Sequence, residues 1–219
     1  MEKITTKAII LQVIDYSDSQ LIVQAYTSEF GRMGFITGKQ SKTGKTKVLF
    51  QPLFLLEITF YNNPKQEVQR VSSVQLWKPF VDIPFNHGKT FISLYISELL
   101  SKTLKEHIAN PELFEFCTHS LDLFDHTQTN WNSFHLSFMA HLSKYLGIFP
   151  TFGFTTSTGN KNRNDLELLT SLIETPITNF AQLTFNKTQR QNLLNSLLHY
   201  YQHHLPIGDL HSHLVLQQF

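Results

Sequence analysis

The spacing of apolar residues changes once along this chain, near residue 85, and that change limits the folds available to it. Before it, short β-branched and apolar runs are separated by turn-forming residues, which is typical of strands. After it, apolar residues recur every three to five positions, which is typical of amphipathic helices. A block of strands followed by a block of helices predicts an α+β protein with two domains, residues 1–80 and 81–219.

The first domain is predicted to contain five strands. They are expected at Lys7–Val13, Gln20–Thr27, Arg32–Gly38, Val48–Tyr61 and Glu67–Lys78, with Pro52 at an edge or a bulge of the fourth. Five short strands with glycine-containing turns predict a small β-barrel of the OB-fold kind. A small open Greek-key sheet would give the same pattern, so the residues alone leave both topologies open.

The second domain is predicted to be helical. Its helices are marked by apolar sets from Phe91 to Leu104, Leu113 to Phe124, Trp131 to Phe149 and Leu194 to Leu205. Asn110 and Asn130 are expected to cap the second and third of these helices at their N-termini. Gly147 and Pro206 are expected to end the third and the last. Residues 150–164, rich in Thr, Gly and Asn, predict an irregular loop.

Charge is distributed unevenly between the two domains. The first carries ten Lys and Arg against six Asp and Glu, a net charge of +4, whereas the second carries eight against eleven, a net charge of −3. Such asymmetry indicates two modules with different partners. The basic first domain is therefore the candidate for binding an anionic ligand.

Several classes of protein are disfavoured by what the sequence lacks. The one cysteine, Cys117, excludes an internal disulfide and a thiolate-rich zinc site, and it falls on an apolar helical stripe that predicts burial. No run approaches the roughly 20 apolar residues of a membrane span, and the first residues do not resemble a signal peptide. We therefore expect a soluble, cytoplasmic protein.

A lysine-rich segment after the third expected strand is the strongest candidate for DNA contact. Its cations fall within nine residues that include no acid, and they are Lys39, Lys42, Lys45 and Lys47. Such a segment can neutralise phosphates, although a solvated hairpin turn has the same composition. Arg32 and Lys7 would extend the DNA-binding patch along the barrel. Tyr26, Phe35 and Tyr61 are candidate platforms for bases, although each also suits a barrel core.

The same segment, from Gly38 to Thr46, approaches the P-loop that binds nucleotide phosphates. That motif has four residues between its first glycine and its Gly-Lys-Thr, whereas this segment has five. A helix should also follow a P-loop, and the residues that follow here predict a strand. These two observations argue against nucleotide binding, and no hydrolase motif is present.

Metal binding has one candidate pair in the sequence. His199 and His203 lie four residues apart on one helix face, which is a spacing that can bind a metal. No carboxylate or cysteine lies within that helix turn to complete the site. We expect a solvated or partner-facing helix end, with no metal and no other cofactor.

Several runs of the sequence resemble the RecO family of recombination mediators. In the first domain these runs are Lys7–Leu11, Asp15–Ser19, Leu21–Val23, Tyr26–Thr27, Gly31–Arg32, Gly38–Lys39 and Leu49–Leu53. In the second domain they are His141–Gly147, Leu197–Leu205, Ser212, Val215–Leu216 and Phe219. These runs occur in the same order as in the family, and together they span nearly the whole chain.

The resemblance implies an N-terminal OB-fold DNA-binding domain followed by an all-helical C-terminal domain. It implies a bacterial, non-enzymatic factor that binds single-stranded and double-stranded DNA, anneals strands, and helps to load the recombinase with RecR at the nucleoid. The alternative is an OB-fold protein-interaction module that does not bind DNA. Many members carry a four-cysteine zinc knuckle, which residues 150–175 lack, and His211 replaces a basic residue before the C-terminal serine.

The resemblance also implies binding of the acidic C-terminal tail of single-stranded-DNA-binding protein. A tail that ends in an apolar residue needs an apolar pocket with a cation at its rim. On the helix from Trp131 to Leu146, we predict this site at Trp131, Phe138 and Lys144, with Lys102 and Lys105 as alternative cations. The usual role of such a stripe is in the protein core.

Overall fold

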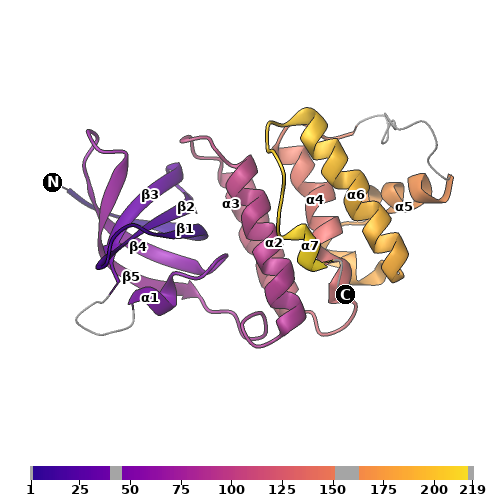
Figure 1. Cartoon of the computed structure of the whole chain (residues 1–219), viewed down its shortest axis with the longest axis horizontal. Helices are drawn as coiled ribbons and strands as arrows, with labels where there is room; N and C mark the ends of the chain where they lie inside the picture. The colour runs from indigo at the N-terminus through magenta and orange to yellow at the C-terminus, as the bar shows by residue number, and fades with distance from the viewer. Residues whose placement is uncertain (1, 40–45, 151–162, 217–219) are drawn as a thin grey trace. The chain divides into compact units, whose positions relative to one another are not determined.

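A computed structural model of the chain describes residues 2–39, 46–150 and 163–216 (Figure 1). The chain divides into two units, of which the first joins Met1–Val81 to Ser93–Thr118 and the second joins Asp82–Ile92 to His119–Phe219. Helices α2 (His87–Thr103) and α3 (Pro111–His126) therefore each contribute residues to both units. The unit that holds the strands thus includes residues from beyond position 81.

Five strands of the first unit close into a barrel with the order β1-β2-β3-β5-β4 (Figure 1). They are β1 (Glu2–Asp15), β2 (Gln20–Thr27), β3 (Gly31–Gly38), β4 (Leu55–Asn62) and β5 (Val68–Lys78). Neighbouring strands are antiparallel except β3 and β5, whose short parallel pairing, Gly34–Ile36 with Val68–Arg70, closes the ring. This topology confirms the predicted OB-like barrel and excludes the open sheet.

Inward-pointing side chains fill the barrel with apolar groups. They are Ala8, Ile10, Val23, Ala25, Phe35, Phe50, Leu56, Ile58 and Phe60. Phe35 has no exposed surface and meets the ring of Phe60 edge-on, with centroids 5.4 Å apart. Tyr26 is also buried, beside Phe114 of α3. Of the three candidate base platforms, Phe35 and Tyr26 are therefore core residues, whereas Tyr61 is half-buried at the surface.

The segment before β4 does not form the first half of the predicted strand Val48–Tyr61. Thr46–Leu49 forms one helical turn, α1, and β4 begins only at Leu55. Between them Leu53 has a φ of 64°, and its backbone N–H donates to the carbonyl oxygen of Ile10 at 2.7 Å. The prediction was wrong because an apolar run does not distinguish a strand from a buried turn. A helix thus does follow the lysine-rich segment, so only its spacing argues against a P-loop.

The second unit is helical. Besides its parts of α2 and α3, it contains η1 (Trp131–Ser133), α4 (Phe134–Tyr145), α5 (Arg163–Glu174), η2 (Ile177–Gln182), α6 (Lys187–His204) and α7 (His213–Leu216). In its core, Phe134 stacks on Phe124 with ring centroids 4.2 Å apart and meets Phe180 edge-on at 5.1 Å. Each fully buried phenylalanine stabilises the fold by about 1.5–3 kcal/mol. Within the described residues, no helix combines the length and hydropathy that crossing a membrane requires.

Most of the predicted helix ends are confirmed. Asn110 caps α3 by accepting a hydrogen bond from the backbone N–H of Leu113 at 3.0 Å. Gly147, with a φ of 70°, follows the end of α4, and α6 ends at His204, shortly before Pro206. The prediction for Asn130 was wrong: its side chain caps no helix and instead donates to the carbonyl oxygen of Ala181.

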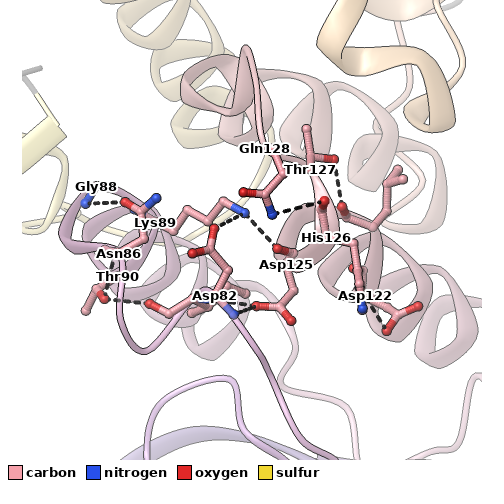
Figure 2. A network of polar contacts seen from close by, with 12 residues as sticks. Asp82, Asn86, Gly88, Lys89, Thr90, Asp122, Asp125, His126, Thr127 and Gln128 are labelled. Carbon is pink, nitrogen blue, oxygen red and sulfur yellow. Dashed lines mark hydrogen bonds and ion pairs between the residues drawn. The ribbon is translucent and has the colours of Figure 1, made fainter.

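A lysine without exposed surface, Lys89, joins the segment before α2 to the end of α3 (Figure 2). Its Nζ lies 2.7 Å from Oδ2 of Asp82 and donates to the carbonyl oxygen of Asp125, also at 2.7 Å. The carboxylate of Asp125 in turn accepts the backbone N–H groups of Asp82 and Ile83 at 2.9 and 2.7 Å. The ring of Phe124 lies 5.4 Å from the ammonium. A buried charge is tolerated only with such compensation.

Replacement of Lys89 by methionine should lower the free energy of unfolding by about 3 kcal/mol, because the oxygens of Asp82 and Asp125 lose their cation. Chemical denaturation followed by circular dichroism measures this change. The matched control is Lys102→Met on the same helix, where the ion pair with Glu98 is partly exposed and is expected to contribute about 1 kcal/mol or less. Equal losses in the two variants would contradict this role for Lys89.

Candidate nucleic-acid interface

Lys39 directly follows β3, and it is the residue of the lysine-rich segment whose side-chain contacts the structure describes. Its Nζ lies 2.8 Å from Oδ1 of Asp15, and its backbone N–H donates to the carbonyl oxygen of Ser19. The Lys39 and Asp15 side chains are 24% and 66% exposed, so this is a partly exposed ion pair, and a phosphate that binds Lys39 would compete with Asp15. Lys42 and Lys45 lie outside the described residues, and Lys47 lies within α1.

A groove of about 390 Å³ lies next to Gly38, the residue before Lys39. It is lined by Gln20, Ile36, Thr37, Gly38, Gln66, Val68, Arg70 and Val71. The β4–β5 turn on one side is fixed by the buried amide of Gln69, which bonds both backbone groups of Asn63 and the carbonyl oxygen of Gln66. OB-folds bind oligonucleotides between their β1–β2 and β4–β5 loops. Gln20 and Gln66 bring the ends of those two loops to this groove.

The outer surface of β2 and β3, which OB-folds use to bind oligonucleotides, is poor in charge here. Because Val23 and Phe35 point into the core, their neighbours point outward. Apart from Tyr26 and Arg32, whose side chains contact Phe114 and the end of α2, the outward residues are Gln20, Ile22 and Gln24 on β2, and Gly34 and Ile36 on β3. This stretch of the two strands offers neither a cation nor an aromatic ring.

Arg32, predicted as part of the DNA-binding patch, is bound to the end of helix α2. Its Nη1 donates to the carbonyl oxygens of Ser101 at 2.5 Å and Leu104 at 3.1 Å. Its backbone N–H donates to Glu106, and its carbonyl oxygen lies 2.7 Å from Nδ1 of His107. Carbonyls at a helix C-terminus lack intrahelical partners and carry partial negative charge, so the guanidinium caps them. Phosphate contact by Arg32 stays a prediction, and it would compete with these bonds.

Lys7 lies exposed on β1, with its Nζ 4.6 Å from the ring centroid of Trp77. Lys78 lies 5.1 Å from the same ring, which also stacks on Phe114. The described members of the predicted patch therefore have three different neighbours: Trp77 for Lys7, helix α2 for Arg32, and Asp15 for Lys39. The structure does not gather them into one cluster.

The second unit holds a small apolar pocket with a half-buried arginine. Its lining residues are Gly88, Ile92, Trp131, Asn132, His135, Arg190, Gln191, Leu194 and Leu216. Trp131 packs so closely on Gly88 that a Cβ there would lie 2.2 Å from the indole. The Nη1 of Arg190 donates to the carbonyl oxygen of Phe185 at 2.6 Å. Burial and then the charge of Arg190 lower the pKa of His135 to about 3, so the imidazole is neutral at pH 7.

Among the three predicted partner-binding residues, Trp131 lines this pocket and the other two do not. Phe138 has no exposed surface, and its ring packs 5.7 Å from that of Phe134. Lys144 is exposed near the other end of α4, with its Nζ 5.2 Å from the ring of Phe149. The spacing of residues along one helix identified the apolar stripe, but it did not show which of its residues other parts of the fold bury. Arg190 comes from α6, which packs on α4, and no sequence signal indicated it.

Two other candidate sites have ordinary surroundings. Cys117 has no exposed surface, and burial raises the pKa of its thiol, which confirms the predicted buried small hydrophobe. His199 and His203 lie on α6 as predicted. In the part of the chain that the structure describes, no three His, Cys, Asp or Glu side chains group closely enough to hold a metal.

Comparison with known proteins yields matches over both parts of the chain. Residues 1–80 match the family model described as recombination protein O N terminal, and residues 86–213 match recombination protein O C terminal. The chain is 30% identical to DNA repair protein RecO of Bacteroides fragilis, with 92% of each chain covered. It is 28% identical to DNA repair protein RecO of Azobacteroides pseudotrichonymphae, with 91% of each covered. For DNA repair protein RecO of Flavobacterium psychrophilum, the identity is 29% over 93% of this chain and 92% of that protein.

Replacement of Arg32 by methionine should lower the free energy of unfolding by about 2–4 kcal/mol, because two carbonyl oxygens lose charged hydrogen bonds. Thermal and urea denaturation measure the loss. Arg70→Met, at an exposed position on β5, is the control and should change stability by no more than about 0.5 kcal/mol. An Arg32 variant of unchanged stability that binds DNA more weakly would instead identify Arg32 as a phosphate contact.

Proposed function

The chain belongs to the recombination protein O family, and on this premise we propose that it mediates recombination in DNA repair by binding single-stranded and double-stranded DNA and annealing complementary strands. It is not an enzyme: members of this family act by binding. Cations of the barrel would neutralise phosphates and so lower the repulsion between two strands. RecR is proposed as its partner in recombinase loading, in the bacterial cytoplasm.

One observation carries the DNA-binding part of this proposal. The groove beside the β1–β2 and β4–β5 loops has Gly38 in its lining, and the first lysine of the lysine-rich segment directly follows Gly38. A strand that follows the groove would therefore reach Lys39 and the lysines after it. Annealing of complementary oligonucleotides coated with the cognate single-stranded-DNA-binding protein tests the mediator role directly. Acceleration by this chain supports it, and the absence of any acceleration would contradict it.

Replacement of Lys39, Lys42, Lys45 and Lys47 by alanine should flatten the salt dependence of single-stranded DNA binding. Each phosphate neutralised contributes about 0.7 to the slope of log affinity against log salt, so a loss of about 1.5–3 is expected. Fluorescence anisotropy over a salt series measures it, and melting should be nearly unchanged. If the four-alanine variant keeps the salt slope of the wild type, the segment is only a solvated turn. If the wild-type protein binds no DNA at all, the alternative function, a protein-interaction module, is favoured.

The pocket of the second unit supports binding of the acidic tail of single-stranded-DNA-binding protein. Its lining residues Trp131, Leu194 and Ile92 offer an apolar contact surface to the terminal apolar residue of such a tail. Arg190 supplies the cation for the acidic groups, in place of the predicted Lys144. A guanidinium that binds a carboxylate gives a charged, geometrically specific contact.

Replacement of Arg190 by glutamine should weaken binding of the tail peptide to the full chain by about tenfold or more, since a charged hydrogen bond contributes about 1.5–3 kcal/mol. The matched variant Lys144→Gln should leave the affinity unchanged. Isothermal titration calorimetry compares the two. The opposite result would return the site to Lys144 and reject this pocket.

A further inference from the structure

The outer surface of β1, β4 and β5 carries an aromatic ring between two cations. In the strand register, Lys3 of β1 pairs with Tyr61 of β4, and Tyr61 pairs with Arg70 of β5. Their neighbours Ile4, Phe60 and Val71 pack against the barrel core, so these three side chains point outward. With strands about 4.8 Å apart, the two cations lie roughly 10 Å apart across the ring.

The surroundings of Tyr61 are polar and open. The Nζ of Lys3 lies 5.2 Å from the ring centroid, and both Lys3 and Arg70 are exposed. A hydrogen bond with Ser72, followed by the charge of Lys3, lowers the pKa of the phenol. The hydroxyl group of Tyr61 is thus hydrogen-bonded, and its ring lies at the surface and is not packed into the core.

The next positions along the same surface are small and hydroxylated. The hydroxyls of Thr5 and Thr59 lie 2.9 Å apart, and Thr59 pairs with Ser73 on β5. Beyond them, Glu57 is the one carboxylate along the described β4 strand, and it accepts a hydrogen bond from Gln75 at 2.5 Å. A polymer lying across Tyr61 therefore meets cations and small polar groups.

Arg70 connects this surface to the candidate groove. It pairs with Ile36 of β3 on its other side and lines the groove next to Gly38. A chain that stacks on Tyr61 and passes Arg70 therefore enters the groove that leads to Lys39. On β2 and β3, the outward residues that helical segments leave uncovered are amides, aliphatic groups and a glycine, because Tyr26 and Arg32 contact Phe114 and the end of α2.

Resting on the DNA-binding function proposed above, we infer that Tyr61 is a base-stacking platform for single-stranded DNA, with Lys3 and Arg70 contacting the phosphates on either side. Stacking on an aromatic ring is independent of base sequence, which suits a protein that must anneal any strand. Double-stranded DNA, whose bases are already stacked, gains nothing from this platform.

The test compares an oligothymidylate of about 20 nucleotides with an abasic oligomer of equal length, by fluorescence anisotropy on the full chain. Tyr61→Leu should bind oligothymidylate about five- to thirtyfold more weakly and bind the abasic oligomer as wild type does. Tyr61→Phe should bind both normally, as should the control Tyr16→Leu at an exposed tyrosine elsewhere on the barrel. Lys3→Gln and Arg70→Gln should weaken both oligomers and lower the salt slope by about 0.7 each.

Two results would overturn the inference while leaving DNA binding intact. One is wild-type affinity of Tyr61→Leu for oligothymidylate, and the other is an equal loss for both oligomers in a variant that melts like wild type. If the wild-type protein binds neither oligomer, the proposed function itself fails and the platform with it.

Discussion

The guanidinium of Arg32 caps the carbonyl oxygens at the C-terminal end of helix α2, and the first unit depends on that contact. Beside it, Gly31 has a φ of 66°, and a Cβ there would lie 2.5 Å from the carbonyl oxygen of Ile108. The β2–β3 turn and the α2–α3 connection therefore touch backbone to backbone. The hydroxyl of Ser97 adds a hydrogen bond to the carbonyl oxygen of Leu11 on β1. The barrel is thus fixed to these helical segments at its strands as well as its turn.

Cations that look alike in the sequence have different roles in the fold. Arg32 donates to carbonyl oxygens at the end of α2, and Lys89 binds the partly exposed carboxylate of Asp82 and the buried carbonyl oxygen of Asp125. Both charges therefore have partners within the fold. Lys3, Lys7 and Arg70 remain on exposed strand positions. Net charge per domain counts all of these equally, although only exposed cations act on a ligand at a distance. The surface available for phosphate is therefore better judged from strand register than from composition.

Local patterns of the sequence were sufficient wherever the structure is decided locally. The strand Gln20–Thr27, the cap at Asn110 and the helix end at Gly147 all follow from alternation, side-chain chemistry or backbone conformation within a few residues. Predictions that depend on tertiary neighbours failed or stayed incomplete. Phe138 and Trp131 lie on the same apolar stripe, yet Phe138 is buried, whereas Trp131 lines a pocket.

The division of helices α2 and α3 between the two units has a consequence for synthesis. All five strands are complete at Lys78, yet the unit that contains them also requires Ser93–Thr118. A ribosome adding about 5–20 residues per second takes several seconds to translate the remaining 40 or so residues. During that interval the nascent barrel lacks the carbonyls that bind Arg32 and the ring of Phe114 that covers Tyr26. The speed of translation after the strands have left the ribosome therefore sets how long this apolar surface is open to chaperones.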